Sequence, residues 1–504
     1  MTQNRPYTKV VVLGGGTAGW MSATGIASLL GRAGVEVTLV ESEAIGIVGV
    51  GEATLPHLRF FNQTLGIDEM DFMAATRATV KLGIEFVDWG RKGDSYIHPF
   101  GDYGMPNDGV GFHHFWRKFS DRAGPICDYS LPVVAARQGR FAPPSSDARS
   151  VLSTYRFAYQ FDATAYAPYL RKIGEARGVA RIEGRVVDAK LSASGDIESV
   201  VLEDGRAIKG DLFIDCSGFR GLLIEQALQT GYDEWTNWLP CDRAVAAPCQ
   251  HAGPLLPYTR ATARVAGWQW RIPLQHRTGN GHVYSSAFST DQDAEDRLVR
   301  SLEGPLIADP RVLRFTTGKR RMLWNRNCVA VGLAGGFLEP LESTSIYLIQ
   351  QGITYLVELF QGAGDTAVAR AEYNRMMDLE FERIRDFLIL HYVATQRDDT
   401  PFWKHMTGMN LPDSLHEKME LFSATGLVQT YDHGLFLEPS WLAVYLGQRV
   451  IPNDYDPRVD QFPEIDISRN LSGLKRHISE AASRLPSHAE WIDRNCPTNQ
   501  LVAS

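Results

Sequence analysis

The sequence predicts an α/β fold that combines a Rossmann-type βαβ unit, a β meander and a mainly helical C-terminal part. Three patterns predict this class. A short apolar stretch at residues 9–13 runs into a glycine-rich turn, a helix pattern and a second strand. Residues 180–215 alternate in polarity and contain the turn signals of a meander. After residue 342, apolar side chains recur at helical spacing.

The elements can be assigned in chain order. Predicted helices are 17–30, 56–65, 69–81, 164–177 and two long helices after residue 342. Predicted strands are 9–13, 35–40, the meander 180–215 with a buried strand at 211–215, strands within 260–289, and 328–331. Residues 93–146 are rich in Gly, Pro and aromatic residues and lack periodicity, so we expect an ordered, loop-rich insertion there.

Composition and charge narrow the possible functions. A chain of 504 residues is too long for one hydrophobic core, so two or three lobes are expected. The net charge of −8 argues against nucleic acid as a partner. The six cysteines are scattered, which predicts neither a disulfide framework nor a metal site and fits a reducing cytoplasm. No secretory signal and no membrane-spanning run is apparent, so a cytoplasmic location without membrane attachment is expected.

The glycine-rich turn matches the dinucleotide fingerprint G-x-G-x-x-G. In this fingerprint the first Gly makes the tight turn, the second lets a pyrophosphate approach the backbone, and the third lets the helix pack close to the strand. The N-terminus of the following helix supplies N–H donors for the phosphates. Glu41 ends the second strand 22 residues after Gly19, where its carboxylate can accept hydrogen bonds from a ribose. The residues predicted to contact the dinucleotide are Gly14, Gly16, Thr17, Ala18, Gly19 and Glu41.

The distribution of the nucleotide lobe along the chain favours FAD over NAD. The chain has one fingerprint, and the lobe resumes at residues 211–218 and 328–336. Such interleaving is typical of FAD-binding proteins with the glutathione-reductase type of fold. With no second fingerprint, reducing equivalents are expected to arrive as reduced flavin. The predicted segments are 1–95, 151–225 and 320–365 for FAD binding, 96–150 for a substrate-pocket insertion, 226–319 for a substrate or tunnel β lobe, and 366–504 for a helical C-terminal substrate lobe.

Residues 268–273 contain the pattern W-x-W-x-I-P. Trp268 and Trp270 occupy alternate positions of a predicted strand, so both face one side and form an aromatic wall, and Pro273 ends the strand. From the residues alone, core packing is the more common role of such a pair.

Together with the start G-G-G-T-A-G-W, this pattern resembles the flavin-dependent tryptophan halogenase family. Three further segments resemble the same family, and the likeness runs from about residue 8 to about residue 405. These segments are the flavin-contacting strap 47–54, the return strand 211–221 and the segment 339–347.

The resemblance implies a two-component halogenase. FADH2 from a separate flavin reductase, O2 and bromide or chloride give hypohalous acid, which passes through a tunnel to an electron-rich arene such as indole. Trp268, Trp270, Ile272 and Pro273 would separate the two pockets. Flavin binding would be reversible. The alternatives are an FAD-dependent aromatic hydroxylase, which needs neither Lys81 nor the wall, and a non-catalytic flavin-binding protein.

Residue roles follow from the resemblance. Lys81 matches the essential lysine, which aims the electrophilic halogen, whereas from the sequence alone it would be a solvated lysine. Glu342 matches the catalytic glutamate, which polarises the halogenating agent or takes the arene proton. It also suits an acid at a helix start. Further flavin contacts implied by the family are Val50, Gly51, Val186, Leu333 and Ile346.

Two sites depart from the family pattern. Thr344 and Ser345 match the halide site, but Ser345 replaces the usual Gly, and we expect bromide to be accepted at least as well as chloride. His98 and Phe100 match a pair that stacks on the indole. Residues 431–446 do not match the lid that grips the amino acid, which predicts a native substrate other than free tryptophan.

Overall fold

The computed structural model describes residues 7–45, 51–360, 366–431 and 434–496. The chain forms two compact units, each assembled from three separate stretches. Unit 1 comprises Met1–Arg77, Phe161–Asp242 and Arg314–Glu382, and unit 2 comprises Ala78–Gln160, Arg243–Leu313 and Arg383–Ser504. The predicted α/β class is confirmed, whereas the finer division into six segments stays a prediction.

The main sheet of unit 1 has six strands in the order β20-β21-β12-β1-β2-β8. β1 lies inside it and pairs in parallel with β2 and β12, and such strands are buried on both faces, which explains the apolar run at residues 10–13. The strands are β1 (Lys9–Leu13), β2 (Glu36–Glu41), β8 (Ala180–Glu183), β12 (Leu212–Asp215), β20 (Trp324–Asn325) and β21 (Cys328–Ala330).

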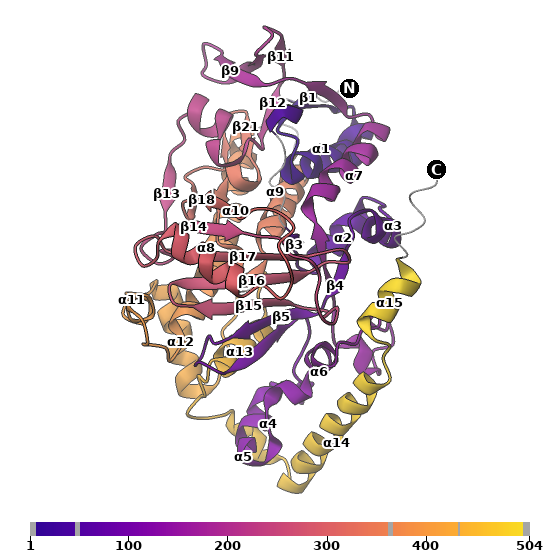
Figure 1. The fold of residues 1–504 in the computed structure, drawn as a ribbon, viewed down its shortest axis with the longest axis vertical. Coiled ribbons are helices and arrows are strands. Elements are labelled where there is room, and N and C mark those ends of the chain that lie inside the picture. The colour runs from indigo at the N-terminus through magenta and orange to yellow at the C-terminus, as the bar shows by residue number, and fades with distance from the viewer. Residues whose placement is uncertain (1–6, 46–50, 361–365, 432–433, 497–504) are drawn as a thin grey trace. The chain divides into compact units, whose positions relative to one another are not determined.

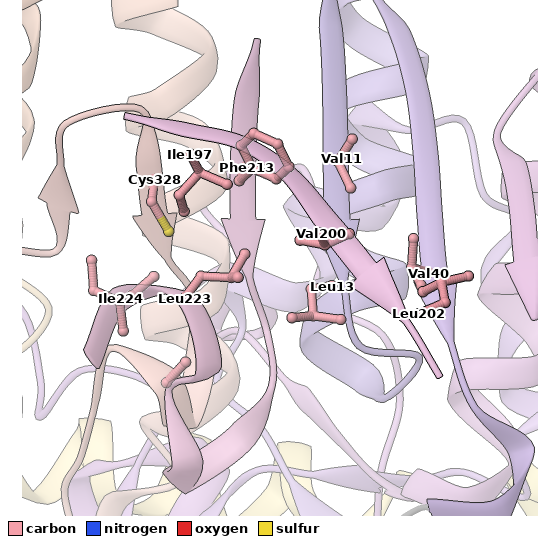
Figure 2. Packing of buried hydrophobic residues seen from close by; sticks show 12 residues of the cluster. Val11, Leu13, Val40, Ile197, Val200, Leu202, Phe213, Leu223, Ile224 and Cys328 are labelled. Atoms are coloured by element: carbon pink, nitrogen blue, oxygen red, sulfur yellow. The ribbon is translucent and has the colours of Figure 1, made fainter. Parts of the chain in front are cut away.

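A β meander packs against this sheet and closes the core of unit 1. Figure 2 shows β10 side chains facing Val11, Leu13 and Val40 of the main sheet. Helices α1 (Thr17–Leu30) and α7 (Ala163–Ala176) lie side by side (Figure 1). The meander strands are β9 (Val186–Leu191), β10 (Ile197–Leu202) and β11 (Ala207–Lys209), in the order β11-β10-β9.

The remaining elements of unit 1 surround these sheets. A small sheet has the order β13-β19-β22. Its strands are β13 (Tyr232–Glu234), β19 (Gly318–Arg320) and β22 (Gly336–Phe337). The other elements are β3 (Gly51–Ala53), α2 (His57–Thr64), α3 (Glu69–Ala75), α9 (Ser345–Phe360) and α10 (Thr366–Val393), whose last residues belong to unit 2.

Unit 2 is built on a seven-stranded sheet of order β18-β14-β17-β16-β15-β5-β6 (Figure 1). The sheet is mostly antiparallel, but β15 and β5 pair in parallel. Its strands are β5 (Gly83–Val87), β6 (Ser95–Pro99), β14 (Arg243–Ala246), β15 (Thr259–Arg264), β16 (Gly267–Pro273), β17 (Thr278–Tyr284) and β18 (Arg311–Arg314). Two further strands, β4 (Thr79–Lys81) and β7 (Ala158–Asp162), pair with each other in antiparallel register.

The helices of unit 2 come mainly from the C-terminal part of the chain, as the sequence predicts. The last two are drawn in yellow in Figure 1. The helices are α4 (Phe112–Lys118), α5 (Ser120–Ala123), α6 (Leu131–Arg137), α8 (Asp291–Arg300), α11 (Pro401–Thr407), α12 (Asp413–Thr425), α13 (Glu438–Gly447), α14 (Glu464–Ser483) and α15 (His488–Asn495). Within the described ranges, no helix is both long and apolar enough to cross a membrane.

One sequence-based assignment is wrong, and a second is incomplete. Residues 69–81 do not form one helix, because α3 ends at Ala75, Arg77 has a left-handed backbone (φ 55°), and Lys81 lies on β4. Residues 93–146 contain three short helices besides loops. None of these helices exceeds seven residues, which is too short for periodicity to reveal.

Candidate functional site

The glycine-rich turn joins β1 to α1. Gly14 has φ 116°, and a Cβ there would lie 2.4 Å from the Cys216 carbonyl oxygen, so the turn requires glycine. A Cβ at Gly19 would lie 1.7 Å from the Gly14 carbonyl oxygen, so α1 packs directly on the turn. By contrast, a Cβ at Gly16 would meet no atom within 4 Å. The backbone at Gly16 therefore faces open space, which suits the approach of a phosphate.

The N-terminus of α1 suits an anion. Its N-cap residue, Gly16, makes no side-chain cap, and no acidic residue occupies the first turn, which includes Thr17 and Ala18. The first N–H groups of a helix have no partner within the helix, and together with the helix dipole they favour a negative charge. The turn and this helix end thus fit the diphosphate of a dinucleotide.

Glu41 lies at the end of β2, beside the turn. A Cβ on Gly15 would collide with its carboxylate, at 1.5 Å from Oε2. Arg181 Nε donates to Oε1, and Trp20 Nε1 lies 3.4 Å from Oε2. The carboxylate is therefore held in place by protein groups. The sequence did not reveal Arg181, because β8 was assigned to the meander rather than to an edge position beside β2.

The other predicted flavin contacts that the structure describes fall at four places in unit 1. Leu333 lies on a 3-10 helix, Gly332–Ala334, and a Cβ on Gly332 would lie 2.8 Å from the Cβ of Ala18, so this turn adjoins the glycine-rich turn. Ile346 is buried in the first turn of α9, and Gly51 is buried in β3. Val186 packs at the edge of the meander core. Val50 lies outside the described residues.

Glu342 is fully buried and ends a 3-10 helix, Pro340–Glu342. Ser343 then takes a left-handed backbone (φ 59°), and α9 begins at Ser345. The expectation that Glu342 opens the long helix is therefore wrong, because Ser343 interrupts the helical backbone. A left-handed residue other than Gly costs about 1–3 kcal/mol, and such strain persists where the surroundings hold it, often at functional sites.

Thr344 immediately precedes α9, and its side chain is fully buried. Its Oγ1 has no hydrogen-bond partner among the described residues, whereas buried hydroxyls are normally bonded. Ser345, the next residue, is half-buried. The helix behind them is anchored to α10, because Tyr347 and Tyr355 both donate to Glu380, at 3.0 and 2.8 Å. A buried donor beside a helix N-terminus fits a halide.

Lys81 is fully buried on β4 of unit 2. Its Nζ lies over the ring of Phe100, 5.2 Å from the centroid, a distance suited to a cation–π contact. Its strand is tied to the W-x-W-x-I-P strand, because Thr79 Oγ1 donates to the Pro273 carbonyl at 2.7 Å. The structure thus joins Lys81, Phe100 and Pro273, which the sequence identified separately.

The two tryptophans of the pattern lie on β16 with their rings adjacent, 6.2 Å between centroids. Trp268 is 1% exposed and therefore a core residue, whereas Trp270 is half-buried. A Cβ on Gly281 of the next strand would lie 2.0 Å from the Trp270 indole, so that glycine makes room for the ring. Ile272 is buried, and Pro273 ends the strand as predicted.

His98 belongs to an aromatic cluster that we call the aromatic box: His98, Phe387, Phe436 and Trp441. The ring of His98 lies 5.8 Å from Phe387 and 6.2 Å from Phe436. Phe387 stacks on Phe436 at 3.8 Å and meets Trp441 edge-on at 5.3 Å. Phe387 was missed in the sequence because it sits in the apolar stripe of α10, where it could not be distinguished from a core residue.

Near this box, Glu438 and Trp441 bond to other protein groups, whereas in the described part of the chain the hydroxyl of Tyr445 does not. Glu438 Oε1 lies 3.4 Å from Nδ1 of His113, and this hydrogen bond lowers the pKa of the glutamate. Trp441 Nε1 donates to the Phe436 carbonyl at 3.2 Å. The ring of Tyr445 stacks on Phe422, with 4.1 Å between centroids. The Tyr445 hydroxyl is buried and has no hydrogen-bond partner among the described residues.

Comparison with known proteins decides the family. The family model for tryptophan halogenase matches residues 9–464. The chain belongs to the tryptophan halogenase family. It is 36% identical to tryptophan 6-halogenase SttH of Streptomyces toxytricini, over 96% of this chain and 97% of that protein.

Solved structures agree with this assignment. A flavin-dependent halogenase from Xanthomonas campestris is 47% identical, with a TM-score of 0.94 over 97% of this chain and 99% of that one. A flavin-dependent halogenase from Brevundimonas sp. BAL3 is 42% identical, with a TM-score of 0.94 over 98% of this chain and 100% of that one. The predicted flavin-dependent halogenase activity is thereby confirmed, and the hydroxylase alternative is not favoured.

Proposed function

We propose that this halogenase uses FADH2 from a separate flavin reductase, together with O2 and a halide, to halogenate an electron-rich arene such as indole or an indole derivative. The observation that carries the proposal is Lys81, a fully buried lysine on a strand bonded to the end of the tryptophan pattern. Its Nζ lies over the ring of Phe100, one of the residues expected to contact the arene.

The proposed flavin site is the glycine-rich turn with the N-terminus of α1. Open space at Gly16 and the uncapped helix support phosphate binding there. When bound, reduced flavin with O2 supplies the oxidising power that converts halide into hypohalous acid. Thr344 is proposed to hold the halide, because its buried hydroxyl has no partner in the described part of the chain.

Lys81 is proposed to orient the halogenating agent. Its Nζ can donate a hydrogen bond to the oxygen of hypohalous acid, or attack the halogen through its neutral form to give a haloamine and water. Phe100 under Nζ limits the directions that the amine can take. Glu342 is proposed to accept the proton that the arene loses after the halogen adds, since a positioned carboxylate can act as a general base.

The proposed substrate is an arene without the amino-acid group of tryptophan. The carboxylate of Glu438 faces His113, and the rings of Phe387 and Phe436 stack on each other beside His98. The aromatic box thus offers flat apolar surfaces and few free polar groups.

The test uses a flavin reductase, NADH, FAD, bromide and a panel of indoles and phenols, with products read by mass spectrometry. Indole or a related arene should be brominated, and free tryptophan should be turned over more slowly at saturation. Tryptophan turnover far faster than that of every arene without the amino-acid group would overturn the substrate proposal and leave the halogenase assignment intact.

A further inference from the structure

We propose that His488, on the C-terminal helix α15, is a positioning residue that holds the strand of Lys81 by accepting the backbone N–H of Val80. The distance from Val80 N to His488 Nε2 is 3.0 Å, and the two residues are 408 positions apart in the chain. Val80 precedes Lys81 on β4. This bond therefore fixes the backbone of the residue before the lysine that carries the proposed catalytic amine. The inference rests on the proposed role of Lys81.

The hydrogen bonds of His488 specify one tautomer. A backbone N–H can only donate, so Nε2 must be the bare nitrogen that accepts from Val80. Nδ1 lies 2.9 Å from the Leu255 carbonyl oxygen, so it must carry the proton and donate. The ring is fully buried, and burial lowers its pKa to about 4. At neutral pH it is therefore the uncharged form that this geometry needs.

The anchor behind His488 does not depend on β4. The backbone N–H of His488 donates to the Gly139 carbonyl at 2.8 Å. Ser487 and Glu490 form a capping box at the start of α15. Trp491 of the same helix meets Phe141 edge-on at 4.9 Å. His488 is thus a side chain on a secured helix end, and its only link to β4 among the described contacts is through its ring.

A second polar side chain, that of Gln160, also holds β4. The Gln160 side chain donates to Thr79 Oγ1 at 3.1 Å and to the Val80 carbonyl at 3.2 Å. Both backbone polar groups of Val80, the residue before Lys81, are therefore bonded to side chains: Gln160 to the carbonyl and His488 to the N–H. A three-residue strand makes few backbone hydrogen bonds to a neighbouring strand. The side chains of Gln160 and His488 therefore help to fix the backbone position from which the Lys81 side chain extends.

The test compares two substitutions of His488 in the full chain. His488→Leu removes the acceptor, whereas His488→Gln retains an oxygen that can accept from Val80 and an amide that can donate to Leu255. We measure bromination of indole, and in parallel the hypobromous acid that escapes to a diffusible scavenger. His488→Leu should lower indole bromination about 10- to 100-fold. Escape to the scavenger should rise, and His488→Gln should recover most of the lost bromination.

Ser487→Ala is the matched control, because it removes the cap of the same helix without touching Val80. It should lower Tm yet leave the ratio of bromination to escape unchanged. The inference fails if His488→Leu, folded by circular dichroism, keeps the wild-type ratio, or if Ser487→Ala changes the ratio equally. It also fails if His488→Leu cannot fold and His488→Gln folds but shows no bromination. Lys81→Ala tests the proposed function separately, since full activity in that variant would refute the role of Lys81 itself.

Discussion

At the scale of single residues, the proposed chemistry depends on polar side chains that are buried away from water. Lys81, Glu342 and Thr344 are each fully buried. Burying such groups costs free energy that ordinary folding would avoid. The left-handed Ser343 adds backbone strain between Glu342 and Thr344. Glu342, Ser343 and Thr344 thus bring two buried polar side chains and a strained backbone into three consecutive residues, as functional sites often do.

Glu342→Gln tests the proposed proton acceptor. The amide keeps the size of the side chain but cannot take a proton, so kcat for indole bromination should fall about 10²- to 10⁴-fold. Production of scavengeable hypobromous acid should fall much less, because that step precedes proton loss from the arene. Quantitative mass spectrometry of brominated indole measures the effect. Bromination within threefold of wild type would remove Glu342 from the mechanism.

Ser345→Gly tests the halide site. Ser345 is half-buried beside the unbonded hydroxyl of Thr344, and its side chain adds a polar group next to the proposed anion. Wild type in equimolar bromide and chloride should yield at least as much brominated as chlorinated product. The glycine variant should shift the ratio toward chloride, measured by mass spectrometry. Clear chloride preference in the wild type would contradict the expectation.

At the scale of elements, the accuracy of a sequence-based assignment depends on the length of the element and on the strength of its pattern. β1 and α1 were predicted to the residue, because a buried parallel strand and a fourteen-residue helix carry strong patterns. The three residues of β4 carry no such pattern, so Lys81 was assigned to the helix before it. Phe387 and Arg181 were missed because their roles depend on contacts between distant elements.

Gly19→Ala tests the turn between β1 and α1. The added Cβ would lie 1.7 Å from the Gly14 carbonyl oxygen, so α1 would have to move away from the turn. FAD affinity should fall at least about tenfold, since the helix N–H groups would leave the phosphates. Gly31→Ala, at the other end of α1, is the matched control, because it meets no atom within 4 Å and its φ of −56° suits alanine.

Fluorescence titration with oxidised FAD and with dithionite-reduced FAD measures the flavin affinity of Gly19→Ala and of Gly31→Ala. Gly31→Ala should bind as the wild type does. Equal FAD affinity in Gly19→Ala and wild type, with both folded, would show that the flavin is not held at this turn.

At the scale of the whole molecule, local sequence patterns predict the fold class but do not report the packing that separates the two units. The fingerprint, the meander and the later helices together specify an α/β fold, because each pattern is local. The two units are each assembled from three stretches, and their boundaries fall within stretches that carry no composition change, as at residues 77–78 and 160–161. Such boundaries follow from packing between distant parts of the chain, which local patterns do not report.

Buried histidines make the stability of the molecule depend on pH. Burial lowers the pKa of His114, His282 and His488 to about 4, against 6.5 in an unfolded chain. Between these values the unfolded state binds more protons, so the free energy of unfolding falls as pH drops from 6.5 toward 4. Each histidine contributes about 3 kcal/mol. Glu52 has the opposite effect on stability. Burial raises its pKa to about 7, so as pH falls the folded state binds this proton before the unfolded state does, and the free energy of unfolding rises.

The balance of three histidines against one glutamate predicts a net loss of stability of a few kcal/mol between pH 7 and pH 4.5. Urea unfolding followed by circular dichroism at several pH values measures it. His488→Gln should reduce the pH dependence, because it removes one of the three groups. Stability that stays constant or rises over this range would show that these histidines do not stay neutral in the folded protein.

The most direct test compares the products of wild type and Lys81→Ala by mass spectrometry. Wild-type protein and Lys81→Ala are each incubated with flavin reductase, NADH, FAD, bromide and indole, after equal FAD binding has been checked. The account predicts a product with the paired bromine isotope pattern from the wild type, and a loss of about 10³-fold or more from Lys81→Ala. A hydroxylated indole in place of the brominated one, or equal bromination by both proteins, would contradict it.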